Sequence, residues 1–124
     1  MRNYYGVYQN KMTREKINID QFNKLKLLVG TIEKAENFPE AKKLAYKLYI
    51  NFGSYGKKWS SAQITENYKI DELNGMQIIA AVNLGNKKIG KFTSEVLVMG
   101  VDDNNSNVLL LHPDKKIQNG AQVN

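Results

Sequence analysis

The 124-residue sequence contains no cysteine, and this absence excludes disulfide bonds, thiolate catalysis and zinc sites built from cysteine. A single histidine, His112, leaves little for a metal site made of imidazoles. No apolar run approaches the roughly 20 residues needed to cross a bilayer, and residues 1–11 lack the apolar segment of a signal peptide. We therefore expect a cytoplasmic protein that does not insert into membranes.

Residues arranged for catalysis are equally scarce. Two acid pairs, Asp71–Glu72 and Asp102–Asp103, lie in turn-like segments, and adjacent side chains diverge, so we interpret both pairs as turn and capping residues. No serine lies near His112 in a nucleophile-elbow sequence. The chain also lacks a Walker loop and a dinucleotide fingerprint. We expect a protein that is not an enzyme and that holds neither a cofactor nor a metal.

Lysine, in contrast, is abundant, and its distribution matters more than the net charge of +6. Residues 41–65 and residues 83–94 contain lysines and no acid. The lysines of these two basic windows are Lys42, Lys43, Lys47, Lys57 and Lys58 in the first, and Lys87, Lys88 and Lys91 in the second. Two such windows in a small domain can form a positive face that attracts nucleic acid. A solvated, lysine-rich surface without a ligand is the alternative.

The second basic window has the more informative layout. Its lysines follow the apolar run 76–82. Two of them lie between Gly85 and Gly90, and the third lies between Gly90 and the aromatic residue Phe92. Glycine permits tight turns, and an aromatic face can stack on a base, so this layout is typical of a rigid sheet that holds a loop against a polyanion. A lysine-bearing hairpin with no ligand is again the alternative.

The apolar pattern predicts short strands separated by turns. Alternation from Leu44 to Phe52 has the period of a half-buried strand, and residues 57–62 follow it across a glycine-rich turn as the second arm of a hairpin. The other expected strands are 25–35, with a bend or bulge at Gly30, and 76–82, 96–101 and 108–111. Only 18–24 and 64–73 look helical. This order favours an all-β barrel or sandwich and is compatible with a five-stranded Greek-key barrel of the OB type.

Residues 1–17 form an expected N-terminal arm that precedes a single domain of residues 18–124. The arm carries Tyr4, Tyr5 and Tyr8 without clear periodicity. We expect these tyrosines to pack on the barrel or on a partner subunit.

Three segments together resemble the tRNA-binding domain family. They are Val29-Gly30-Thr31-Ile32-Glu33-Lys34-Ala35-Glu36, then Ser60-Ser61-Ala62-Gln63-Ile64-Thr65 with Tyr68 and Glu72-Leu73-Asn74-Gly75 after it, and finally residues 83–95. The family includes the C-terminal domain of bacterial methionyl-tRNA synthetase, the endothelial monocyte-activating polypeptide domain and the CsaA proteins, and segments 60–65 and 94–100 are most similar to CsaA. The resemblance extends from Phe22 to the C-terminus. It implies an OB fold with short added strands and one or two short helices, and a homodimer.

The resemblance also implies a function and a site. Family members bind tRNA, whereas CsaA is also an export-related chaperone, so the ligand is tRNA, an unfolded preprotein, or both; a factor that recruits tRNA in trans for a synthetase is a further alternative. The recognition residues that it implies are Asn83, Lys87, Lys88, Ser94 and Glu95. Asn83 would donate to and accept from the ligand, the lysines would meet phosphates, and Ser94 and Glu95 would either fix the loop or touch the ligand.

To these residues we add others from the two basic windows. They are Lys42, Lys43, Lys57, Lys58, Lys91 and Phe92, with Ser60 and Ser61 as strand hydroxyls that line the surface. We interpret Trp59 as a core residue and Phe92 as exposed. For a polypeptide ligand, we expect an apolar groove of Phe92, Tyr55 and Phe38 with lysines at its rim.

Overall fold

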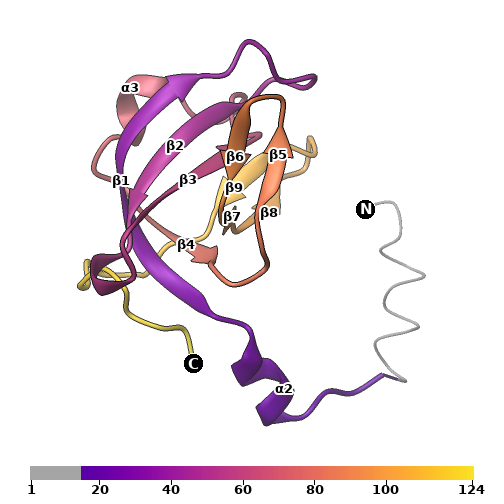
Figure 1. Cartoon of the computed structure of the whole chain (residues 1–124), viewed down its shortest axis with the longest axis vertical. Coiled ribbons are helices and arrows are strands. Elements are labelled where there is room, and N and C mark those ends of the chain that lie inside the picture. Colours follow the sequence, from indigo (N-terminus) through magenta and orange to yellow (C-terminus); the bar gives the residue numbers. More distant parts are fainter. Residues whose placement is uncertain (1–14) are drawn as a thin grey trace.

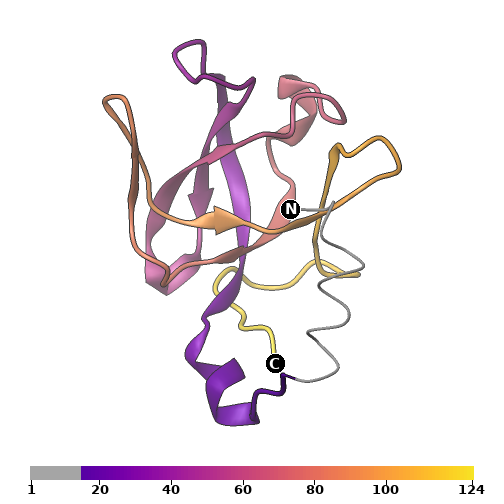
Figure 2. The ribbon, with the colours of Figure 1, turned by 90° about the vertical axis from the view of Figure 1, so that its right-hand side faces the viewer.

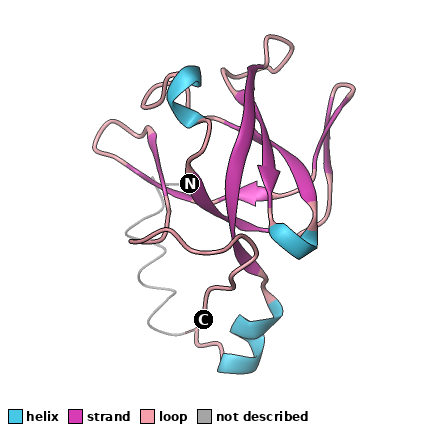
Figure 3. Cartoon of the chain, turned by 90° about the vertical axis from the view of Figure 1, so that its left-hand side faces the viewer, coloured by secondary structure: helices cyan, strands magenta, loops and turns pink. Residues whose placement is uncertain are grey.

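The structure is a computed structural model that describes residues 15–124, and strands dominate it (Figures 1 and 3). A five-stranded antiparallel sheet has the order β3-β2-β1-β4-β7. Its strands are β1 (Leu27–Asn37), β2 (Tyr46–Asn51), β3 (Lys57–Ala62), β4 (Gln77–Ala81) and β7 (Leu97–Val98). Two hairpins are added, β5 (Lys87–Ile89) with β6 (Phe92–Ser94), and β8 (Gly100–Asp102) with β9 (Val108–Leu110). The helices are α2 (Ile19–Lys24), α3 (Ile70–Leu73) and the 3-10 turn η2 (Gly53–Tyr55).

The two edges of the sheet meet through the segment that joins β6 to β7. The Glu95 N–H donates to the Trp59 carbonyl at 2.8 Å, and the Trp59 N–H donates to the Glu95 carboxylate at 2.9 Å. The Ser61 N–H donates to the Ser94 hydroxyl at 3.0 Å. These bonds give β3 a partner on its outer edge and nearly close the sheet into a barrel. The strand order and this closure confirm the predicted OB-type Greek-key barrel.

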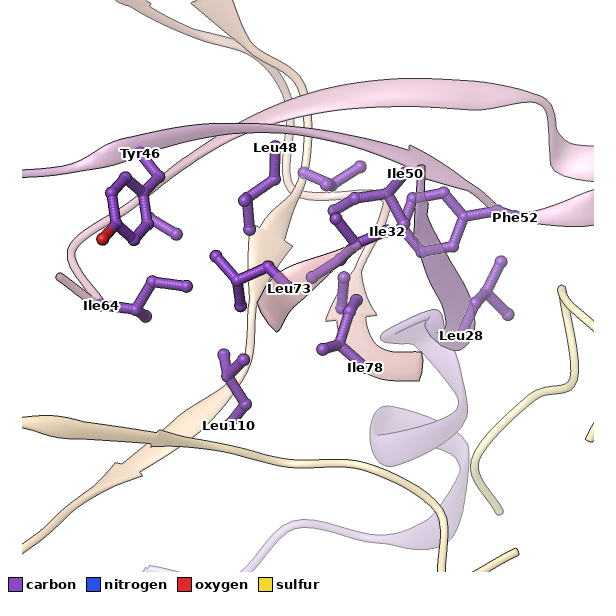
Figure 4. Close-up of a cluster of buried hydrophobic side chains, with 13 residues drawn as sticks. Leu28, Ile32, Tyr46, Leu48, Ile50, Phe52, Ile64, Leu73, Ile78 and Leu110 are labelled. Atoms are coloured by element: carbon purple, nitrogen blue, oxygen red, sulfur yellow. The ribbon is translucent and has the colours of Figure 1, made fainter. Parts of the chain in front are cut away.

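The interior of the barrel is filled by one face of β2 and its neighbours (Figure 4). Leu48, Ile50 and Phe52 are fully buried, as the alternation predicted. The predicted pattern is wrong at Leu44, whose side chain is 75% exposed. The reason is that β2 begins at Tyr46, so Leu44 belongs to the preceding loop and the alternation does not apply to it.

Gly30 is a point of close packing in β1. The register shift of this strand lies between Ile32 and Lys34, so the irregularity is not at Gly30 itself. A Cβ at Gly30 would lie 2.6 Å from Ile50 Cγ2 and 2.6 Å from the ring of Phe52. The glycine therefore leaves room for the core side chains of β2.

Several expected elements have different bounds. The apolar run 96–101 divides into β7 and β8, because the Met99 N–H donates to Ile79 while the Met99 carbonyl accepts from Leu111. The expected helix 64–73 shortens to α3. None of the helices within residues 15–124 has the length and apolar composition needed to cross a bilayer.

The acid pairs have the predicted structural roles at two positions. The Glu72 carboxylate accepts from the Lys69 N–H at the start of α3, at 2.7 Å. The Asp103 carboxylate accepts from the N–H groups of Asn105 and Asn107 in the β8–β9 turn. The tyrosines of the N-terminal arm lie outside the described residues, so their packing stays a prediction.

Candidate nucleic-acid interface

The two basic windows meet across one groove. The β1–β2 loop (residues 38–45) and the β5–β6 hairpin project from the same end of the barrel (Figure 2) and enclose a groove of about 710 Å³. We call it the basic groove; its lysines are Lys42 and Lys43 from the loop and Lys87 and Lys88 from β5. Glu40 is an acidic residue on the same lining, to which Ser61 of β3 and Gln63, just after β3, also contribute. Four exposed ammonium groups in one groove create a positive potential that attracts a polyanion.

Ser94 and Glu95 fix the β5–β6 hairpin to the barrel. From the sequence, these two residues could either fix the loop or touch the ligand. Ser94 accepts from the Ser61 N–H, and Glu95 forms reciprocal bonds with the backbone of Trp59. Both side chains therefore fix the hairpin, which is the first of the two roles considered for them. At the tip, Gly90 has a φ of 62°, a conformation that suits glycine.

Asn83 uses its amide within the chain. Its Oδ1 accepts from the Lys26 N–H at 2.9 Å, and its Nδ2 donates to the Lys24 carbonyl at 2.7 Å. These bonds tie the end of β4 to the segment that leads into β1. Asn83 thus positions the start of the second basic window, and its donor and its acceptor each have a partner inside the protein.

The two adjacent serines of β3 lie on opposite faces of the strand. Ser61 lines the basic groove. Ser60 is 0% exposed and donates to the Val96 carbonyl at 3.0 Å. The prediction that Ser60 lines the binding surface is wrong, because side chains alternate along a strand and only one of two neighbours can face the groove.

An aromatic cluster lies on the outer face of β2 and β3. We define it as Phe38, Tyr49, Trp59 and Phe92. Trp59 is half-buried and packs on Tyr49 at a centroid distance of 4.8 Å and on Phe92 at 5.9 Å. The prediction of a core tryptophan is wrong, since Ser60 takes the inward position.

The other aromatic expectations are met only in part. Phe92 is partly rather than fully exposed, because its ring packs edge-on against Phe38 at 5.1 Å. Phe38 is buried and cannot line an open groove as expected. Tyr55 is exposed but lies on η2, between β2 and β3. Tyr49 also belongs to this surface and was not predicted. Lys47 was part of the first basic window but not of the expected site. The alternation of both residues with the core residues of β2 was the available signal.

Three predicted lysines do not line the basic groove. Lys57 forms an ion pair with Glu33 at 3.0 Å. Hydrogen bonds from Lys57 and Asn51 lower the pKa of Glu33, and the bond to Glu33 raises the pKa of Lys57. Lys58 is half-buried on the same face of β3 as Ser60, and Lys91 is exposed at the hairpin tip. Lys57 is therefore partly neutralised, whereas Lys91 directly follows Gly90, which lines the groove.

The comparison with known families decides the identity of this barrel. Residues 27–122 match a family model described as "Putative tRNA binding domain". The chain belongs to this family. The prediction from the three sequence segments is confirmed, and the matched model describes a binding domain.

Relatives of this tRNA-binding domain occur alone and within larger proteins. Methionine–tRNA ligase of Methanocaldococcus jannaschii is 33% identical over 124 residues, which cover 94% of this chain but 19% of the ligase. The chain thus spans about a fifth of that relative. The chaperone CsaA of Bacillus anthracis str. Ames has a TM-score of 0.83 and 42% identity, covering 89% of this chain and 100% of CsaA. CsaA of Picrophilus torridus has a TM-score of 0.82 and 46% identity, covering 88% and 100%.

A second, apolar groove adjoins the basic one in this tRNA-binding domain. Its volume is about 540 Å³, and its apolar lining consists of Ile64, Leu84, Val96, Leu97, Val98, Val108 and Leu110 with further aliphatic side chains. It shares Ser61, Gln63, Lys87 and Ile89 with the basic groove. One continuous surface therefore changes from basic to apolar along its length. Within residues 15–124, no three side chains of the metal-binding types lie close enough to hold a metal ion.

Proposed function

We propose that this chain is a non-catalytic tRNA-binding protein that holds folded tRNA by its phosphates in the basic groove. The observation that carries the proposal is the convergence of Lys42, Lys43, Lys87 and Lys88, from segments far apart in the sequence, on one groove of a domain in this family. A location in the cytoplasm, where tRNA is found, is part of the proposal.

The kind of recognition follows from the charged residues that are present. Lysine acts as a point charge and lacks the flat, forked geometry with which arginine reads bases. The two arginines of the chain, Arg2 and Arg14, both lie in the N-terminal arm. We therefore expect weak sequence preference and strong salt dependence, because each neutralised phosphate releases counterions.

Replacing Lys87 and Lys88 by alanine tests the proposal. We expect weaker tRNA binding and a shallower plot of log affinity against log salt, with a loss of slope of roughly 0.7–0.9 for each phosphate contact removed. Stability should change by no more than about 0.5 kcal/mol, because both side chains are exposed. The measurement is tRNA binding by fluorescence anisotropy at several salt concentrations.

The Lys115→Ala, Lys116→Ala double variant is the matched control. It removes the same amount of positive charge from two exposed lysines that are neighbours in the sequence and do not line the basic groove. We expect this control to keep nearly the full slope. An unaltered slope in the Lys87 and Lys88 variant would contradict the proposed site.

The apolar groove supports a second function, that of a CsaA-type chaperone for unfolded, export-bound preproteins. An extended polypeptide would place apolar side chains in this groove and acidic ones against the lysines next to it. Because the two grooves share Lys87 and Ile89, we expect a reduced and alkylated, permanently unfolded test protein to compete with tRNA. Recruitment of tRNA in trans for an aminoacyl-tRNA synthetase would use the basic groove alone, without such competition.

We also propose that the protein is a homodimer. Val101 and Leu109 are cross-strand partners on the β8–β9 hairpin, and their side chains are 53% and 42% exposed. A second copy related by a two-fold axis would cover this apolar pair and place two basic grooves in one assembly. Two grooves would bind one large, folded RNA more tightly than either groove alone.

A further inference from the structure

The aromatic cluster faces away from the core. On β2, Tyr49 and Lys47 alternate with the buried Leu48 and Ile50, and on β3 Trp59 is next to the buried Ser60. Tyr49 and Trp59 are directly paired across the two strands. A sheet face in contact with water is commonly polar, so partly exposed aromatic rings on it are informative.

The cluster begins where the basic groove ends. Lys47 is paired in register with Ser61, which lines that groove. Phe92 is paired with Ile89, another lining residue, within the hairpin that carries Lys87 and Lys88. A strand of nucleic acid whose phosphates occupy the groove would therefore continue directly over the rings.

Lys47 supplies a cation at this junction. Its Nζ lies 5.0 Å from the centroid of Phe38 and 5.4 Å from that of Phe92. Cation–π attraction holds the ammonium between the two rings. A phosphate next to a stacked base would meet this ammonium without a rearrangement of the sheet.

We propose that Trp59, Tyr49 and Phe92 stack unpaired bases, and that Lys47 binds a phosphate of the same nucleotides. Bases in an RNA duplex cover one another's faces, so only unpaired nucleotides can occupy the rings. The inference deepens the proposed function, on which it rests for the identity of the RNA as tRNA. The domain then prefers a part of tRNA where unpaired bases adjoin a helix whose phosphates lie in the basic groove.

Trp59 itself reports the binding, because it is the one tryptophan of the chain. The probes are a single-stranded oligoadenylate of about ten nucleotides, within the roughly 4–16 that one OB fold contacts, and a blunt RNA duplex of equal length. We expect the single strand to quench Trp59 fluorescence and the duplex to leave it nearly unchanged.

Variants separate stacking from charge. Tyr49→Leu and Phe92→Leu should each weaken binding of the single strand about fivefold or more, the lower limit for the loss of one stacked base, with the salt slope unchanged. Lys47→Met, which keeps the aliphatic chain, should reduce the slope by roughly 0.7. Tyr55→Leu is the matched control, an exposed aromatic outside the cluster, and should have no effect.

Several results would overturn the inference. One is equal affinity of wild type and Tyr49→Leu, since Tyr49 lies on β2 and does not hold the hairpin. Another is a fall in salt slope in Phe92→Leu, because the ring would then serve to position the lysines. A third is a response of Trp59 to the unfolded test protein and none to oligoadenylate.

The two proposals fail separately. If tRNA binds with a slope that depends on Lys87 and Lys88 while oligoadenylate leaves Trp59 unquenched, the stacking site is wrong and the basic groove stands. If oligoadenylate quenches Trp59 while the lysine variant keeps the full slope with tRNA, the groove is wrong and the stacking site stands.

Discussion

Asp103 accepts hydrogen bonds from its own β8–β9 turn and from Asn67, which lies between β3 and α3. It accepts from the N–H groups of Asn105 and Asn107, and the amide of Asn67 donates to it at 3.0 Å. The bonds from Asn107, Asn67 and Asn105 lower the pKa of the carboxyl below its ordinary value of 3.8. The folded state therefore favours the ionised form more strongly than the unfolded state does.

The lowered pKa of Asp103 predicts how stability depends on pH. A group with a depressed folded pKa contributes its stability above the unfolded value and loses it as the pH falls through the folded value. Wild type should therefore exceed Asp103→Asn in unfolding free energy by a constant amount near neutral pH, and this advantage should shrink below pH 3.8. Urea unfolding of both proteins across this range is the measurement. A difference that does not vary with pH would contradict the assignment.

Within the central sheet, Gly30 determines how tightly β2 packs on β1. Its neighbours Ile50 and Phe52 are fully buried, and each would lie 2.6 Å from a Cβ at Gly30, so their side chains would have to shift. Gly30→Ala should therefore destabilise the protein, by about 1–3 kcal/mol as in other overpacked cores. Urea unfolding measures the loss. Lys34→Ala, an exposed change on the same strand, should stay within about 0.5 kcal/mol. An unchanged midpoint of urea unfolding in Gly30→Ala would contradict this prediction, because it would mean that Ile50 and Phe52 shift without loss of stability.

The proposed homodimer gives a prediction about assembly. If the β8–β9 hairpin forms the dimer interface, Val101→Lys should give monomers, because a charge would be buried against a second copy. Light scattering at micromolar concentration measures the state. Leu44→Lys is the control, since Leu44 is an exposed apolar residue on a different loop, and this variant should stay dimeric. A monomeric wild type would contradict the dimer.

Dimer formation should also change how much tRNA affinity is lost when Lys87 and Lys88 are replaced. A dimer with two basic grooves would lose contacts in both when Lys87 and Lys88 are replaced. The affinity of such a dimer for tRNA should then fall more steeply than that of a monomeric Val101→Lys protein carrying the same replacements.

Properties that depend on local pattern could be predicted from the amino-acid sequence alone. Alternation along 46–52 placed Leu48, Ile50 and Phe52 in the core, because side chains of a strand point to opposite faces. The acid-free windows contained all four lysines of the basic groove, although they also contained Lys57, Lys58 and Lys91, which do not line it. The family resemblance selected the OB barrel among small β-barrels.

Strand pairing and barrel closure, which local pattern does not specify, fix which residues face the core and which distant segments meet. The segment 57–62 has no clear alternation, so the pairing of Leu48 with Ser60 and of Tyr49 with Trp59 decides which residue faces inward. The same pairing removes Ser60 from the surface and brings Trp59 to it. Likewise, only closure of the barrel brings Lys42 and Lys87 to one groove, because contacts between segments so far apart in the chain depend on strand order rather than on neighbouring residues.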